Sequence, residues 1–507
     1  MMLRFLMPFL ALVATAGASA APMGADEARY LLTRTGFAPA EAEVRQFAPL
    51  SRAEAVERLL AGVRSDARTP PPTWVNEPAE RPRLKEMSDE ERRAFQQRQG
   101  TRGFELRSWW MAEMLATPSP LTERMTLFWH NHFVSSLQKV RIPQLMYRQN
   151  VLLRRHALGN FGEMLHAASK DPAMIIYLDA ATNRRGAPNE NFAREVMELF
   201  TLGEGNYNER DIKEAARAFT GWSLDLDNLE FRRRPMLHDE GVKTVFGKSG
   251  EFDGDAILDL LLAHPACAEF IVRKLWREFV SDAPGGTDAA EIKRIAALFR
   301  TSRYDIRTAL RAIFNSPRFT AAEQRAGLIK SPVELVVGTV RQLGVSYTDP
   351  LPFVFVAAGL GQNLMAPPNV RGWPGGEAWI TSSTLLGRKQ FAERLFRVDE
   401  MREAAGRIPP GVAPQPVMVE REVMRPREFG DIKGAGRMDM DGRQQFMRAA
   451  ASVQFDTEHF LAQFAGQPYT AIQRALLPGE PATPIAVAST PRQLLRSTLL
   501  DPTYQLK

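Results

Sequence analysis

The segment from Asn189 to Trp222, NENFAREVMELFTLGEGNYNERDIKEAARAFTGW, most constrains what this chain can fold into. After a helix start near Asn189, an apolar stripe recurs at helical spacing: Phe192, Val196, Leu199 and Phe200. Gly203 ends this helix, and Asn208 with Asp211 can cap the next one. The segment therefore predicts a helical hairpin with a short turn between its two helices.

Helical signals also dominate the rest of the sequence. Ser51 precedes Glu54 by three residues, a pattern that satisfies free backbone N–H groups at a helix start. Strand signals are few, and the best one runs from Lys243 to Phe246. The sequence predicts a mainly α fold: a multi-helix globular body with long irregular loops and few short strands.

The N-terminal sequence and the loop composition predict four segments. Residues 1–20 carry an early arginine, a short apolar run and small residues before Ala21, as a secretory signal does. We expect a helical body over residues 21–400, a flexible loop or insertion over 401–445, and a helical tail packing on the body over 446–507. The chain is thus expected to be exported, periplasmic or extracellular, with no integral membrane span.

Cysteine content and charge limit the classes of function. Cys267 is the only cysteine, so no disulfide can form within the chain. The formal net charge is +6 over 507 residues, and the basic run Arg232–Arg234 has no interleaved aromatic residues. Nucleic-acid binding is therefore not expected. Attraction to an anionic envelope polymer stays open beside a simply solvated surface.

A polar stripe on the first helix of the hairpin has two interpretations. Helical geometry brings four residues within about 100° of one another: Asn191, Arg194, Glu195 and Glu198. The stripe can be a solvated face with an Arg194–Glu198 ion pair. Alternatively, Glu195 and Glu198 can share a metal or act as general acid and base, if burial moves one pKa toward neutrality.

The motif WHNHF, Trp129 to Phe133, contains His130 and His132 on either side of Asn131. On a helix, the two imidazoles point about 200° apart and cannot meet one metal ion, whereas in an extended segment they share a face. A divalent metal held by His130 and His132 is one interpretation. Packed, hydrogen-bonded histidines are the other.

Two further motifs contain candidate residues in turn-rich sequence. In HDEGVK, His238 and Asp239 can orient a substrate or contribute a metal ligand, and Lys243 can neutralise a phosphate or carboxylate; the alternative is a turn with a solvated charge pair. In GWPGGEAW, Trp373 and Trp379 can flank a sugar or another flat ligand, or they can fill the edge of a core.

Together these motifs, in this order, resemble the bacterial "domain of unknown function 1800" family of exported proteins. Its motifs also cover Arg124, upstream of WHNHF. The resemblance implies a helical, exported protein encoded near an exported protein that is similar to sulfatases, and it implies no established activity. We expect catalytic roles for Glu195, Glu198, His238 and Asp239. Substrate binding is expected of seven residues: Arg124, Asn131, Asn191, Arg194, Lys243, Trp373 and Trp379.

Two functions follow as hypotheses. The first is an envelope-associated enzyme, a hydrolase or polymer-modifying protein, whose Glu, His and Asp side chains converge on one polar pocket. The second is a noncatalytic binding or assembly partner of the exported sulfatase-like protein.

Overall fold

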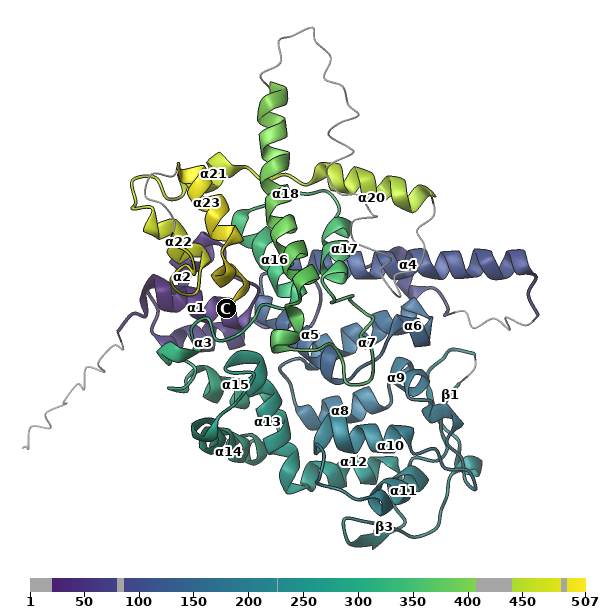
Figure 1. Ribbon diagram of the computed structural model, residues 1–507. Coiled ribbons are helices and arrows are strands. Elements are labelled where there is room, and N and C mark those ends of the chain that lie inside the picture. The colour runs from purple at the N-terminus through teal and green to yellow at the C-terminus, as the bar shows by residue number, and fades with distance from the viewer. Residues whose placement is uncertain (1–20, 80–85, 226, 407–439, 485–489) are drawn as a thin grey trace, which may run out of the picture.

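The computed structural model describes residues 21–79, 86–225, 227–406, 440–484 and 490–507, and nearly all of its regular structure is helical (Figure 1). The mainly α class predicted from the sequence is confirmed. The predicted signal, residues 1–20, and the middle of the predicted insertion, residues 407–439, lie outside the described residues.

The N-terminal part of the chain forms a run of helices with short connections. These are α1 (Gly24–Thr35), α2 (Glu41–Phe47), α3 (Arg52–Ala61), the 3₁₀ turn η1 (Thr73–Asn76), α4 (Asp89–Ala116), α5 (Pro120–His132), α6 (Leu137–Val140), α7 (Pro143–His156), α8 (Phe161–Ser169), α9 (Pro172–Tyr177) and the 3₁₀ turn η2 (Ala180–Thr182).

The predicted hairpin follows, with one departure from the expected geometry. Its first helix begins as α10 (Asn191–Glu195) and continues as the π-helix η3 (Val196–Thr201), before α11 (Glu209–Ala218). As predicted, Asn208 and Asp211 cap α11 reciprocally. A π-helix holds more residues per turn than an α-helix, so the stripe expected along this helix does not form with α-helical spacing.

Two small antiparallel hairpins cover this end of the molecule. The first pairs β1 (Trp222–Leu224) with β2 (Phe231–Arg233), and Trp222 lies opposite Arg233. The turn η4 (Pro235–Leu237) leads to the second, which pairs β3 (Lys243–Val245) with β4 (Lys248–Gly250). The predicted strand from Lys243 to Phe246 thus corresponds to β3.

The remaining helices complete the body. They are α12 (Gly254–Ala263), α13 (Pro265–Phe279), α14 (Gly286–Thr301), α15 (Ile306–Phe314), η5 (Ala322–Gln324), α16 (Pro332–Leu343), α17 (Leu351–Gly359), η6 (Gly376–Trp379), α18 (Ser382–Gly406), α20 (Met440–Ser452), α21 (Thr457–Ala462), α22 (Thr470–Leu476), α23 (Pro491–Leu500) and η8 (Pro502–Gln505).

The C-terminal segment lies beside the first helices of the chain, as Figure 1 shows for α21 to α23 and α1 to α3. Tyr504 joins it to the body, because its carbonyl accepts a hydrogen bond from Lys330 Nζ at 2.8 Å and its hydroxyl lies 2.8 Å from Thr339 Oγ1. Both ends of the region predicted as a loop, 401–445, are helical, since α18 extends to Gly406 and α20 begins at Met440.

Two helices, α5 and α16, are buried along almost their whole length. A helix buried on all sides is normally apolar all round. In α5, however, the buried residues include Glu123, Arg124, His130 and His132. Because buried charges need partners, this helix brings polar chemistry into the middle of the fold.

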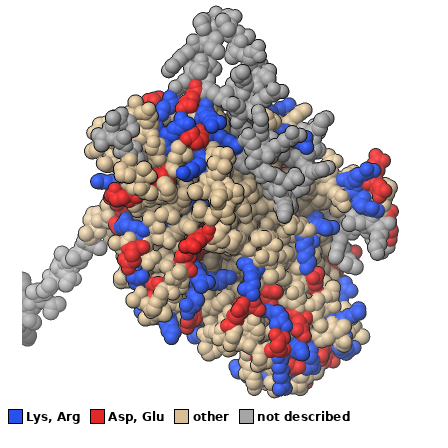
Figure 2. All heavy atoms as spheres, in the orientation of Figure 1, with Lys and Arg blue, Asp and Glu red and all other residues tan. Residues whose placement is uncertain are grey.

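On the face drawn in Figure 2, lysine and arginine side chains alternate with acidic ones over the lower half of the molecule. Among the described residues, no helix is both long and apolar enough to cross a membrane.

Candidate functional site

A cavity of about 740 Å³ lies at the junction of α5, α13, the start of α16 and the turn that contains η6. We call it the α5–α13 cavity. Five of the residues predicted as functional line its wall: Arg124, Asn131, His132, Trp373 and Trp379. It therefore unites two motifs, WHNHF and GWPGGEAW, that stand far apart in the sequence.

Asn131 holds these two motifs together. Its Oδ1 accepts a hydrogen bond from the backbone N–H of Trp373 at 2.7 Å. Gly372 makes this approach feasible: its φ is +87°, and a Cβ there would lie 2.2 Å from Asn131 Oδ1. Only glycine meets both conditions without strain. Asn131 thus has a positioning role for Trp373.

Both tryptophans of GWPGGEAW are buried in the cavity wall. Trp373 is 4% exposed and Trp379 is 6% exposed. The Trp373 ring packs against His130 with its centroid 5.6 Å away, and its Nε1 has no hydrogen-bond partner among the described residues. A buried indole N–H usually finds a partner. Trp373 therefore contributes a flat apolar surface to the cavity wall, while its unpartnered Nε1 is itself buried.

Arg124 is already occupied by carboxylates. Its guanidinium pairs with Glu278 at 2.5 Å and with Glu334, which also binds Lys507. Glu334 is 5% exposed, and these two cations hold its pKa down to about 2 against the opposing effect of burial. Removing Arg124 would take one cation from Glu334 and the ion-pair partner from Glu278, so Arg124 stabilises the cavity wall.

Besides the exposed Arg277, Lys274 on α13 is the cation of the cavity that lacks a counter-ion among the described residues. It makes no ion pair with any carboxylate in the described part of the chain, and its ammonium lies 5.4 Å from the centroid of the Phe270 ring. Burial, with the neighbouring Arg277 as a second cause, lowers the pKa of Lys274 to about 8. An anion bound in the cavity would relieve both effects.

His132 lines the cavity as a neutral imidazole. Its Nε2 lies 3.1 Å from the carbonyl oxygen of Phe200, which can only accept, so Nε2 carries the proton. Burial, with Lys274 as a second cause, holds the pKa of His132 well below its ordinary 6.5. Its Nδ1 has no hydrogen-bond partner among the described residues.

The two histidines of WHNHF, predicted to hold a metal ion, do not face a common point. Because they lie on the helix α5, their rings point in different directions: His130 packs against Trp110 and Trp373, and His132 against Phe133. Burial lowers the pKa of His130 to about 3. In the described part of the chain, no group of three or more His, Cys, Asp or Glu side chains is arranged to hold a metal ion.

None of the four residues predicted as catalytic lines this cavity. Glu198 accepts a hydrogen bond from Tyr207 Oη at 2.8 Å and pairs with Arg371 at 3.0 Å. Glu195 is half-buried, and burial, reinforced by Glu198, raises its pKa. Glu195 ends α10 and Glu198 lies in the π-helix, and both carboxylates are partly exposed.

The expected Arg194–Glu198 pair does not form. The guanidinium of Arg194 instead binds Glu209 through two hydrogen bonds of 2.8 and 2.9 Å, with Glu190 3.4 Å away. Asn191 Nδ2 donates to the carbonyl of Leu178 at 3.0 Å. Arg194 and Asn191, predicted to bind substrate, thus contact other parts of the fold.

The HDEGVK motif forms a separate cluster, held by contacts within the protein. Asp239 pairs with Arg217 at 2.8 Å, and this contact lowers the pKa of the carboxyl. His238 Nδ1 lies 2.9 Å from the carbonyl of Thr220, and the ammonium of Lys243 donates to the carbonyl of Asp239. This cluster fastens the loop before β3 to α11 and does not reach the cavity wall.

The family model for "Protein of unknown function (DUF1800)" matches residues 30–506. The chain belongs to this family. No curated protein and no solved structure matches it. The DUF1800 match contains the whole wall of the α5–α13 cavity except Lys507.

Sequence reasoning about this DUF1800 chain missed Lys274, Glu278, Glu334 and Lys507. Lys274 and Glu278 lie in the amphipathic pattern of α13, where charged residues look like a solvated face. Glu334 has one visible signal, the capping box that it forms with Ser331 at the start of α16. That signal predicts a helix start and gives no sign of the buried ion pairs.

Proposed function

We propose that this protein binds an acidic, hydroxyl-rich ligand in the α5–α13 cavity, such as a segment of an anionic envelope polymer. The observation that carries the proposal is Lys274, a partly buried cation without a counter-ion in a cavity whose wall also holds two tryptophans. Burying an ammonium without a counter-ion costs free energy, and a bound carboxylate or phosphate offsets that cost by pairing with it.

The other groups of the cavity suit the rest of such a ligand. The faces of Trp373 and Trp379 fit the apolar side of a sugar ring. Asp282 and Glu377 also line the cavity, are exposed, and can accept hydrogen bonds from hydroxyl groups. Lys274 would take the acidic group.

We further propose that the protein is exported, on the strength of the signal-like sequence of residues 1–20. An envelope location would place the cavity among acidic polysaccharides and other anionic polymers.

A direct test compares galacturonate with galactose, which lacks the carboxylate. Both sugars would be titrated into the chain from Ala21 onward, with tryptophan fluorescence and heat of binding as readouts. Galacturonate should bind at least about tenfold more tightly than galactose.

A variant pair assigns the binding to the cavity. Lys274→Met should abolish the preference for galacturonate, and Lys293→Met, at an exposed lysine of α14, should leave it unchanged. Equal binding of the two sugars, or a preference that survives Lys274→Met, would contradict the proposal.

A second candidate function is chemistry on the same ligand, as a hydrolase or polymer-modifying enzyme. The specific support is again Lys274, because a pKa of about 8 suits proton transfer near neutral pH. His132, whose pKa lies well below 6.5, is correctly unprotonated at pH 7 but is a weak base. Lys274 is therefore the stronger general base of the two, but only in its neutral form, which predominates above about pH 8.

The enzyme hypothesis is tested by following new reducing ends in polygalacturonate. An active protein should show a rate that rises with an apparent pKa near 8, and Lys274→Arg should remove that activity while keeping a positive charge. Binding without turnover would leave recognition as the function. A stable complex with the sulfatase-like exported protein, unaffected by Lys274→Met, would instead favour an assembly role.

A further inference from the structure

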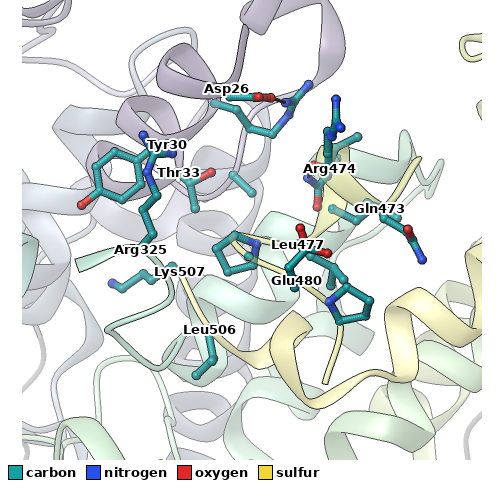
Figure 3. A pocket seen from close by; sticks show the side chains of 18 of the residues that line it. Asp26, Tyr30, Thr33, Arg325, Gln473, Arg474, Leu477, Glu480, Leu506 and Lys507 are labelled. Atoms are coloured by element: carbon teal, nitrogen blue, oxygen red, sulfur yellow. Dashed lines mark hydrogen bonds and ion pairs between the residues drawn. The ribbon is translucent and has the colours of Figure 1, made fainter. Parts of the chain in front are cut away.

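A second cavity, of about 390 Å³, lies between the first helix of the chain and its C-terminal helices (Figure 3). We call it the α1–α22 cavity. Its walls come from α1, from α22 with the loop after it, and from Leu506 and Lys507. None of the residues predicted as functional lines it, and Lys507 is the one residue whose side chain is shared with the lining of the α5–α13 cavity.

The lining of the α1–α22 cavity is rich in cations. Five basic residues face two acidic ones: Arg29, Arg325, Lys330, Arg474 and Lys507, against Asp26 and Glu480. Three of the five have carboxylate partners, since Arg29 pairs with Asp26 and Glu41, Arg325 with Glu27, and Lys507 with Glu334. Among the described residues, the acidic side chain of the lining left without an ion pair is therefore Glu480, and the basic ones left without a carboxylate partner are Arg474 and Lys330.

Lys330 is the buried member of this pair. It is 6% exposed, and its ammonium donates to the carbonyl of Tyr504 at 2.8 Å and lies 4.1 Å from the centroid of the Tyr504 ring. Neither contact supplies a full negative charge. Burial lowers the pKa of Lys330 to about 7 against the opposing effect of Glu334, so the position is costly for a cation that makes no ion pair among the described residues.

Arg474 is exposed on α22 and makes no ion pair with any residue that the structure describes. In Figure 3, Arg474 and Gln473 lie on one side of the cavity, opposite Tyr30 and Arg325. An apolar wall completes the site, and it consists of Leu476, Leu477, Pro478, Pro481 and Leu506. The cavity thus pairs two uncompensated cations with an apolar surface.

We propose that the α1–α22 cavity binds a small organic anion, a carboxylate or phosphate monoester that carries an apolar group. Lys330 and Arg474 contact the anionic group, and the leucine and proline wall takes the apolar part. This site is separate from the proposed function of the α5–α13 cavity and stands without it.

The test uses hexanoate, hexyl phosphate and the uncharged control hexanol, each titrated calorimetrically into the chain from Ala21 onward. At least one of the anions should bind about tenfold or more tightly than hexanol. Hexanoate and hexyl phosphate distinguish a carboxylate ligand from a phosphate ligand.

Variants then locate the site. Arg474→Gln should weaken binding of the anion about tenfold, and Arg307→Gln, at an exposed arginine of α15, should leave it unchanged. Lys330→Met provides a second variant at the buried end, used once its helical circular dichroism matches the wild type.

Three results would overturn the proposal. They are equal binding of hexanol and the anions, binding that survives both Arg474→Gln and Lys330→Met, and binding that is lost in Lys274→Met. The last result would place the anion in the α5–α13 cavity.

Discussion

The α5–α13 cavity and the HDEGVK cluster contain similar polar residues, but these residues differ in whether they have partners within the protein. In the cluster, Asp239, His238 and Lys243 each contact a group of the protein itself. In the cavity wall, Lys274 has no carboxylate partner and lies over the Phe270 ring, and Trp373 Nε1 and His132 Nδ1 have no hydrogen-bond partner among the described residues. Polar groups that the fold satisfies stabilise it, whereas a charge that it leaves without a counter-ion, as at Lys274, is available to a ligand.

The largest effect that we expect comes from Gly372→Ala, which breaks the junction behind the cavity. The new Cβ would lie 2.2 Å from Asn131 Oδ1, at a φ of +87°. Overpacking and backbone strain together should lower the free energy of unfolding by roughly 3 kcal/mol. Urea unfolding measures this loss.

Gly186→Ala is the matched control for that substitution. Gly186 has a φ of +81°, but nothing lies within 4 Å of a Cβ built there. Only the strain of the left-handed backbone remains, so the loss should be about 1 kcal/mol. Equal losses at the two glycines would show that the Asn131 contact contributes nothing.

Lys274→Met should raise the stability of the protein and abolish ligand binding. Removing a desolvated ammonium should raise the free energy of unfolding at pH 7 by roughly 2 kcal/mol, while binding of galacturonate is lost. The folded pKa of about 8 lies below the ordinary 10.5, so the unfolded chain binds more protons between these values. The wild type therefore gains stability as pH rises from about 8 to 10.5.

The difference in unfolding free energy by which Lys274→Met exceeds the wild type should therefore become smaller from about pH 8 to pH 10.5. Lys293→Met, at an exposed lysine, controls for the loss of one positive charge. If the difference in unfolding free energy between Lys274→Met and the wild type were the same at pH 7 and pH 10.5, Lys274 would not be desolvated.

Asp239→Asn should reduce stability and leave ligand binding intact. It weakens the contact with Arg217, which is partly exposed, so roughly 1 kcal/mol of unfolding free energy should be lost at pH 7. Arg217 lowers the pKa of this carboxyl, so its contribution is present above the ordinary 3.8 and disappears as pH falls through the lower folded pKa. Thermal unfolding of wild type and variant from pH 7 to pH 2.5 should show the difference closing below about pH 4.

The smallest effect should come from Arg194→Ala. Its pair with Glu209 is exposed, and such pairs contribute less than about 1 kcal/mol. Both the unfolding free energy and the affinity for galacturonate should change little. A loss of binding in this variant would reinstate the polar stripe of α10 as part of the site.

The fold was largely predictable because it depends on local signals. The apolar period and the caps around Asn208 specify helices over short stretches of sequence, and the mainly α class follows from them. The π-helix at Val196–Thr201 was not predictable, because it replaces the α-helical spacing on which the stripe argument for Glu195 and Glu198 rested.

The site was predictable only in part. WHNHF and GWPGGEAW were singled out by their residues, but the bond from Asn131 to Trp373 joins positions 242 residues apart. Contacts of that range depend on how the helices pack. The same packing gives Lys274 its burial, so nothing in the local sequence separated Lys274 from an exposed helical lysine.

One measurement tests the central claim most directly: calorimetric titration of trigalacturonate into the wild type, Lys274→Met and Asp239→Asn in parallel. The account predicts that Asp239→Asn binds as the wild type does and that Lys274→Met loses at least about tenfold in affinity. Loss of binding in Asp239→Asn, with Lys274→Met unaffected, would contradict it and move the site to the HDEGVK cluster.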